Sequence, residues 1–73
     1  MEIIEITTEF IKIDQLLKFA GIVGNGSDAK FMIADGLIDV NGERCTQRNK
    51  KIRPGDVITI DGDMTLKVKG LLS

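Results

Sequence analysis

The strongest chemical signal in the sequence is a run of cations in the second half of the chain. Between Arg44 and Arg53 there are five Lys or Arg residues and no acid, although the whole chain has a net charge of −1. The rest of the chain therefore holds five cations against eleven acids. This basic stretch consists of Arg44, Arg48, Lys50, Lys51 and Arg53.

A basic stretch of this kind has two interpretations. It can be a solvated loop that only keeps the protein soluble. Alternatively, its cations can meet phosphate groups, which gives an affinity for nucleic acid that falls steeply with salt. In the second case, the acidic remainder repels wrongly oriented encounters and helps to fix the direction of docking.

Catalysis is disfavoured by the composition. The chain has 73 residues, no histidine and one cysteine, Cys45. A single small domain leaves little room for a deep pocket. Without histidine and with one thiol, the commonest general base and a zinc cluster are both excluded, as is an internal disulfide. We therefore expect a non-enzymatic protein with no metal, no cofactor and no small-molecule substrate, in which Cys45 is a packing residue.

The sequence also predicts a cytoplasmic protein without membrane contact. No apolar stretch approaches the ~20 residues that cross a bilayer. The N-terminal residues carry Glu2 and Glu5 where a secretion signal would have cations.

Two short helices are predicted in the first half of the chain. Asp14 is placed as the N-cap of a helix over Gln15–Ala20, and Ser27 as the N-cap of a helix over Asp28–Asp35. The free backbone amides at the N-terminus of the second helix can hold a phosphate. The carboxylate of Asp28 in the first turn would repel an anion, however, and so favours ordinary capping. Phe10 and Phe19 are expected in the core, whereas Phe31 falls outside the apolar stripe.

The remaining segments read as short strands separated by turns. Glu2–Ile6 has the pattern of an edge strand, and Asn41-Gly42 is the preferred dipeptide of a type I′ hairpin turn. The tail from Gly70 to Ser73 is expected to fray. The other predicted strands are Phe10–Ile13, Leu37–Val40, Glu43–Thr46, Val57–Ile60 and Thr65–Val68.

These elements predict one α+β domain over residues 1–73. Two short helices pack on a small curved, mainly antiparallel sheet of about four or five strands.

The order of these elements, with several specific residues, resembles the S-four RNA-binding domain, also called the alpha-L motif. The similarity covers residues 10–60 and is greatest to short stand-alone bacterial members of that family. The matching motifs are Lys12-Ile13-Asp14 with Leu17, Ala29-Lys30 with Ile33 and Gly36, Val40-Asn41-Gly42, and Gly55-Asp56 with Ile58.

The resemblance implies contact with structured RNA, including ribosomal RNA, through the two-helix face and the adjoining loop. Where many members have a Ser-Arg pair before the second helix, this chain has Asn25-Gly26, so one phosphate-binding guanidinium is missing. The expected RNA-binding residues are Lys12, Asn25, Ser27, Lys30, Arg44, Arg48, Lys50, Lys51 and Arg53.

Two other functions are compatible with the sequence. The basic stretch could dock on an acidic protein, which would make the chain an interaction adaptor with protein partners. A sulfur carrier of β-grasp type fits the chain length, but the C-terminal sequence Gly-Leu-Leu-Ser lacks the diglycine that this chemistry requires.

Overall fold

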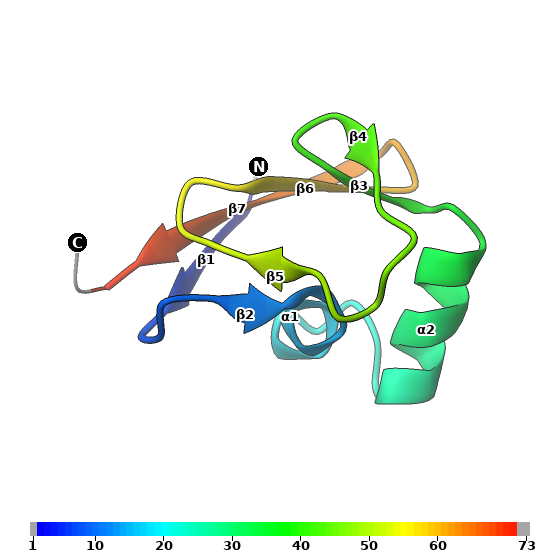
Figure 1. Cartoon of the computed structure of the whole chain (residues 1–73), viewed down its shortest axis with the longest axis horizontal. Helices are drawn as coiled ribbons and strands as arrows, with labels where there is room; N and C mark the ends of the chain where they lie inside the picture. The colour runs from blue at the N-terminus through cyan, green and yellow to red at the C-terminus, as the bar shows by residue number, and fades with distance from the viewer. Residues whose placement is uncertain (1, 72–73) are drawn as a thin grey trace.

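The computed structural model describes residues 2–71, which form two helices and seven strands (Figure 1). The helices are α1 (Ile13–Phe19) and α2 (Gly26–Ala34). The strands are β1 (Glu2–Ile6), β2 (Ile11–Lys12), β3 (Ile38–Val40), β4 (Glu43–Arg44), β5 (Lys51–Ile52), β6 (Val57–Ile60) and β7 (Met64–Gly70).

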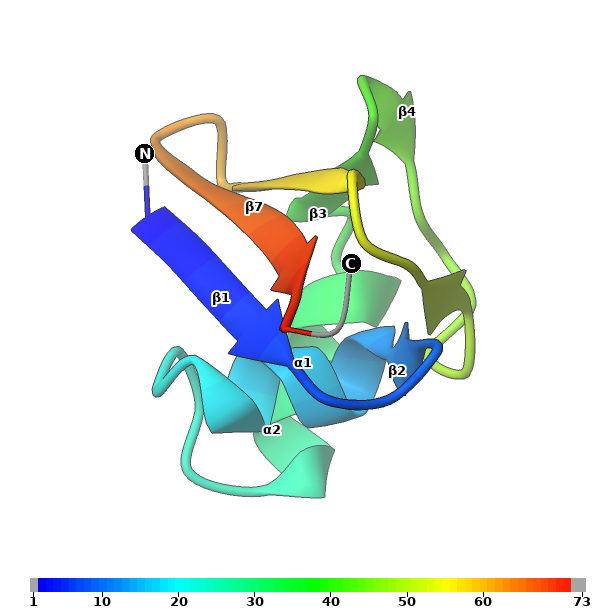
Figure 2. The same ribbon diagram turned by 90° about the vertical axis from the view of Figure 1, so that its left-hand side faces the viewer.

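Five of the strands form one twisted sheet in the order β1-β7-β6-β3-β4, with both helices on the same side of it (Figures 1 and 2). Only the β1–β7 pair of this sheet is parallel, and the other pairs are antiparallel. This confirms the predicted α+β class and the edge position of β1. The sequence did not predict the second sheet, a two-stranded ribbon of β2 and β5.

The predicted hairpin turn between β3 and β4 is confirmed. Asn41 and Gly42 have φ angles of 53° and 84°, so both central residues are left-handed, as a type I′ turn requires. The side chain of Asn41 also ties the turn to β6. Its Oδ1 accepts from the Val57 N–H at 2.9 Å, and its Nδ2 donates to Asp56 Oδ1 at 3.0 Å.

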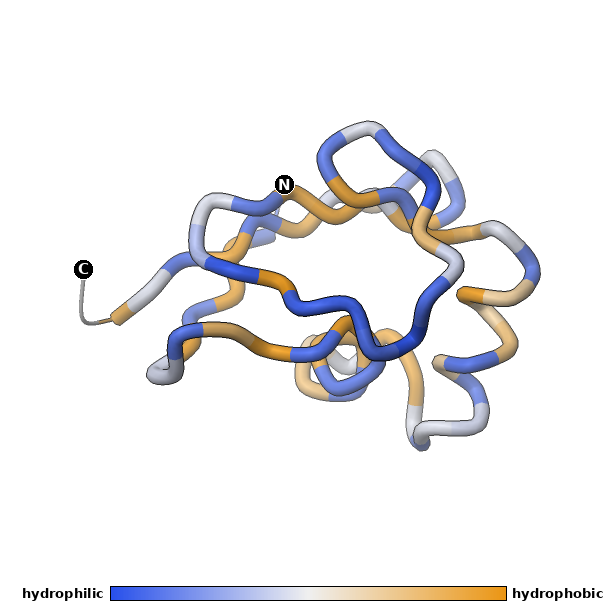
Figure 3. The backbone as a smooth tube through the Cα atoms, in the orientation of Figure 1, coloured by the Kyte–Doolittle hydropathy of each residue, from blue (hydrophilic) through white to orange (hydrophobic). Residues whose placement is uncertain are grey.

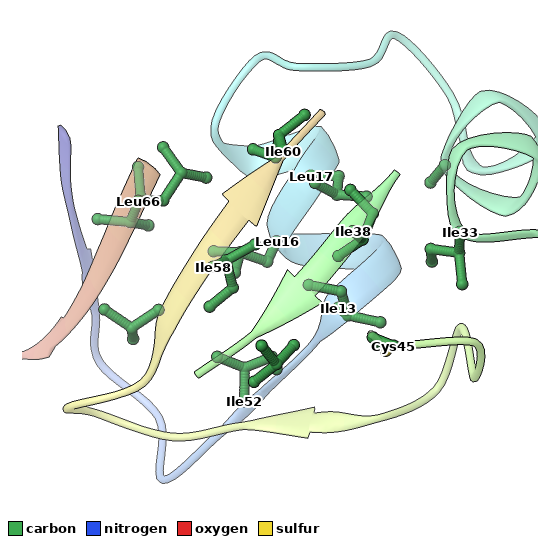
Figure 4. Packing of buried hydrophobic residues seen from close by; sticks show 14 of the residues in the cluster. Ile13, Leu16, Leu17, Ile33, Ile38, Cys45, Ile52, Ile58, Ile60 and Leu66 are labelled. Carbon is green, nitrogen blue, oxygen red and sulfur yellow. The ribbon is translucent and has the colours of Figure 1, made fainter. Parts of the chain in front are cut away.

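The core lies between the five-stranded sheet and α1 (Figure 4). In β6 and β7 alternate residues are buried, because side chains on a strand point to opposite faces in turn. In α1 the buried positions Ile13, Leu16 and Leu17 follow the helical period. From α2, Ala29 and Ile33 complete this core.

The first helix begins at Ile13 with Lys12 as its N-cap, so the prediction that Asp14 is the cap is wrong. The basic stretch explains the difference. The Ile13 N–H donates to the Lys50 carbonyl at 2.9 Å, and the Asp14 N–H donates to the Arg48 carbonyl at 3.3 Å. Two of the N–H groups that have no partner within the helix are thus paired with a distant segment.

The second helix begins at Gly26, and its N-cap is Asn25 instead of the predicted Ser27. The Oδ1 atom of Asn25 accepts from the Asp28 N–H at 2.9 Å. Asn and Ser are about equally good caps, so the sequence alone does not choose between them.

Phe19 is 63% exposed, so the prediction that it fills the core is wrong. It follows Leu17 by two positions, which places the two side chains about 200° apart around the helix. Phe10 is half-buried beside the β2–β5 ribbon.

Gly70 and Leu71, the first residues of the tail that was predicted to fray, are both paired with β1. Gly70 is buried in β7 opposite Ile6, and the Leu71 N–H donates to the Ile6 carbonyl at 2.9 Å. The parallel pairing with β1 therefore extends β7 further than its own sequence indicates. The last two residues of the predicted tail, 72 and 73, lie outside the described residues.

Candidate nucleic-acid interface

The β2–β5 ribbon places two lysines directly opposite each other. Its register pairs Ile11 with Ile52 and Lys12 with Lys51. Ile52 is fully buried and Ile11 is half-buried, whereas both lysines are exposed. Side chains at directly opposite positions share one face, with Cβ atoms about 4.5–5.5 Å apart. The ribbon thus presents a pair of ammonium groups to solvent.

One of these lysines contacts a neighbouring aromatic ring. The Lys51 Nζ lies 5.0 Å from the centre of the Phe10 ring, which is a cation–π contact. Phe10 precedes β2 by one residue, so strand alternation places it on the same side as Lys12. A neutral ring contacts Lys51 without neutralising its positive charge.

The backbone of two further basic residues is fixed at the start of α1. The carbonyl groups of Lys50 and Arg48 accept the hydrogen bonds from Ile13 and Asp14 described above. The loop that carries Arg48 and Lys50, called the basic loop below, is therefore held against the start of α1. Figure 3 shows it there as a continuous hydrophilic segment. We refer to Lys12, Arg48, Lys50 and Lys51, which are all exposed, as the ribbon cluster.

The two ends of the basic stretch lie outside the ribbon cluster. The Arg44 Nε is 3.8 Å from Asp39 Oδ1, and its side chain packs against Gly36. A Cβ added to Gly36 would lie 3.0 Å from an Arg44 guanidinium nitrogen, and Gly36 also has a positive φ of 75°. Arg53 starts the turn before β6, where its N–H donates to Asp56 Oδ2 at 2.8 Å.

The predicted site residues of the second helix form a separate group. Asn25, Ser27 and Lys30 belong to the N-cap and first turns of α2, which lies at one end of the molecule, whereas the ribbon lies nearer its middle (Figure 1). All three residues are exposed. Since Asn25 uses its Oδ1 in the cap, an RNA contact by this residue would use its amide nitrogen.

A cavity of about 490 Å³ lies between the β3–β4 hairpin and the basic loop. Cys45 is buried at its wall, where its thiol donates to the Gln47 carbonyl at 3.3 Å. This geometry fits the expected packing role of Cys45. No pattern in the sequence singles out Gln47 and Glu43, which also line the cavity, because isolated polar residues in a loop or a two-residue strand form no recognisable motif.

Residues 2–71 show neither a metal-binding cluster nor a membrane-spanning helix. No three His, Cys, Asp or Glu residues of that range come together where they could hold a metal ion. Neither of its helices has the length and apolar character needed to cross a membrane.

Comparison with known families gives a match to the S4 domain over residues 4–69. The chain belongs to the S4 domain family. This result confirms the resemblance seen in the sequence motifs. This S4 domain chain is also similar to a probable ribosome maturation protein, RlbA, of Bacillus subtilis. The identity is 37% over 59 residues, which cover 81% of this chain and 83% of the relative.

The same fold occurs in the solved structure of the 30S ribosomal protein S4e from Thermoplasma acidophilum. The TM-score is 0.58 at 23% identity, with 77% of this chain covered. The matched part spans about 30% of that ribosomal protein. At this level of identity the similarity concerns the fold, and it agrees with the predicted arrangement of helices and sheet.

Proposed function

We propose that this S4 domain is a non-catalytic, cytoplasmic protein that binds structured RNA, with ribosomal RNA as its ligand. The observation that carries the proposal is the direct cross-strand pairing of Lys12 with Lys51. Like charges at such positions destabilise a sheet. A phosphate group placed between the two ammonium groups would remove the repulsion and bind to both.

Arg48 and Lys50 extend the proposed RNA contact beyond the lysine pair. The carbonyl groups of Arg48 and Lys50 hold this part of the loop at the start of α1, and the side chains of both residues are exposed. A folded RNA presents phosphates at regular spacing, and a fixed group of cations can select that spacing. Recognition in this mode depends on the shape of the RNA, and its affinity depends strongly on salt.

The remaining predicted residues extend the proposed interface on both sides. Asn25, Ser27 and Lys30 would contact RNA from α2. Arg44 and Arg53 would contact it from the two ends of the basic stretch, where each also has a structural contact.

The names of the similar proteins support a ribosomal ligand. RlbA is described as a probable ribosome maturation protein, and the structural relative is a protein of the 30S subunit. Neither name refers to an enzymatic reaction. We therefore infer that the chain acts through binding, on ribosomal RNA or on a precursor of the ribosome.

The test compares two triple variants with equal net charge. Arg48→Gln, Lys50→Gln and Lys51→Gln remove three cations of the ribbon cluster, whereas Lys18→Gln, Lys67→Gln and Lys69→Gln remove three exposed cations elsewhere. Affinity for purified bacterial ribosomal RNA is measured between 50 and 200 mM salt, a range in which phosphate contacts dominate the change.

The proposal predicts a selective loss in the ribbon variant. Each lost phosphate contact lowers the slope of log affinity against log salt by about 0.7–0.9, so three contacts lower it by about 2 to 3. The control variant should bind nearly as the parent does. Equal losses of RNA affinity in the two variants would mean that only the net charge of the protein matters, which would contradict the proposal.

A further inference from the structure

The first strand, β1, forms an open edge of the five-stranded sheet. It comes last in the strand order, beyond β7, and Figure 2 shows no strand along its outer side. The opposite edge of this sheet, β4, has only two residues, whereas β1 has five. β1 is therefore the longer edge at which another strand can pair.

The hydrogen bonds of β1 show which of its backbone groups face outward. The Ile6 carbonyl accepts from the Leu71 N–H at 2.9 Å, so the backbone groups of Ile6 face β7. Along a strand, the backbone groups of successive residues point to opposite edges in turn. Those of Ile3 and Glu5 therefore point away from the sheet. Within residues 2–71, no strand other than β7 pairs with β1.

Exposed apolar side chains gather around the same edge. Ile3 is 50% exposed on the sheet face that points away from the helices. On the other face, a hollow of about 440 Å³ adjoins the end of β1, and its wall includes Glu5, Ile6, Phe19 and Leu71. Phe19 and Leu71 are 63% and 53% exposed. Apolar side chains concentrated at an open strand are typical of a protein-binding surface.

The charges of β1 favour one kind of occupant. Glu2 and Glu5 are exposed, and within residues 2–71 neither carboxylate makes an ion pair. Lys69 lies opposite Glu5 in β7, one strand further from the open edge. The two carboxylates would repel RNA phosphates. Pairing with β1 of a second copy would bring two carboxylates from each copy into one ladder, whereas Lys or Arg on an incoming strand would meet opposite charges.

We propose that β1 binds an extended, basic peptide segment of another protein, which pairs as an additional strand of the sheet. The N–H and C=O groups of Ile3 and Glu5 bond to its backbone. Its cations lie beside Glu2 and Glu5, and an apolar side chain enters the hollow against Phe19. This surface shares no residue with the ribbon cluster, so the inference does not depend on the proposed RNA binding.

The experiment uses the full chain labelled with ¹⁵N and two synthetic peptides of the same sequence, Lys-Val-Lys-Val-Lys-Leu. In the second peptide every peptide bond is N-methylated, which removes the backbone donors and keeps the charge. Hydrogen exchange of the protein amides is followed by NMR. At ten times its Kd, the first peptide should slow exchange of the Ile3 and Glu5 N–H groups about tenfold. The N-methylated peptide should leave both rates unchanged.

Two substitutions with matched controls test the assignment. Glu5→Lys should weaken binding of the first peptide about fivefold, because it replaces attraction across the strands with repulsion. Glu43→Lys makes the same charge change at the opposite edge, in β4, and should not weaken it. Phe19→Ala should also lower the affinity, whereas Phe31→Ala, equally exposed on α2, should not. The spectra show whether each variant remains folded.

Several results would overturn the inference. Equal slowing by both peptides would mean attraction by charge without strand pairing, and no slowing by either would mean that the edge does not bind such a segment. Protection of Ile3 and Glu5 that rises with protein concentration would make the occupant a second copy. Protection by ribosomal RNA alone would assign the edge to RNA. The RNA affinity of the ribbon variants is measured separately, so the two proposals fail independently.

Discussion

Lys12 and Lys51 lie directly opposite each other across the β2–β5 ribbon, on the face that points to solvent. Their neighbours Ile11 and Ile52 pack inward, so the ribbon is anchored by apolar contacts while its outer face carries two like charges. A pair of this kind opposes folding in the free protein and favours binding of an anion. Stability and RNA affinity should therefore respond in opposite directions when the pair is changed.

Lys12→Glu should make the free protein more stable and weaken its binding of RNA. The substitution turns a like-charge pair into an opposite-charge pair, which contributes about 0.2–1 kcal/mol across strands. Urea unfolding and affinity for ribosomal RNA measure the two effects. Lys18→Glu serves as the control, because it removes a cation from the last turn of α1 and should lower stability. A loss of stability in Lys12→Glu would contradict the account of the pair.

The exposure of Phe19 predicts a contrast with Leu16. Leu16 is fully buried between α1 and the sheet, so Leu16→Ala should lower the free energy of unfolding by about 2–5 kcal/mol. Phe19→Ala should lower it by less than about 1 kcal/mol, because most of the ring is already in water. Thermal or urea unfolding decides the matter, and similar losses in the two variants would place Phe19 in the core after all.

The assignment of the α2 cap to Asn25 is testable by a pair of alanine variants. Asn25→Ala removes the acceptor for the Asp28 N–H and should destabilise the protein by about 1 kcal/mol. Ser27→Ala should change stability by no more than about 0.5 kcal/mol. Asn25→Asp keeps an acceptor and should restore most of the lost stability. A larger loss of stability in Ser27→Ala than in Asn25→Ala would show that Ser27 is the cap.

Asn41 combines a left-handed backbone with two side-chain hydrogen bonds. Asn41→Gly keeps the turn and removes the bonds to Asp56 and Val57, which should destabilise the protein by about 1–3 kcal/mol. Asn41→Ala should be worse than Asn41→Gly, because alanine also resists the positive φ. Equal stability of the glycine variant and the parent would mean that the turn alone fixes the hairpin.

Local patterns in the sequence predicted the parts of the fold that short-range physics controls. Alternating polar and apolar residues predicted β1, and Asn41-Gly42 predicted the hairpin turn. The helix starts were less accurate. Contacts distant in the sequence decide the start of α1, whereas Asn25 and Ser27 are about equally good caps for α2. The first helix begins at Ile13 since its free amides bind the loop that carries Arg48 and Lys50.

In the candidate site, too, local features could be predicted from the sequence, whereas contacts between distant residues could not. The basic stretch was visible in the sequence, and Lys12 was selected through the family resemblance. The pairing of Lys12 with Lys51 was not predictable, since a two-residue strand such as β5 has no recognisable period. The sequence also gave no indication that Arg44 would turn away toward Gly36 and Asp39 while Lys51 stayed beside Phe10.

Ultraviolet crosslinking in bacterial cells that express the protein tests the central claim most directly, when the crosslinked nucleic acid and the crosslinked peptides are both identified. RNA binding through the ribbon cluster predicts ribosomal RNA attached to peptides that contain Lys12 or residues 48–51. Recovery of protein partners with essentially no RNA would contradict the proposed function and support an interaction adaptor.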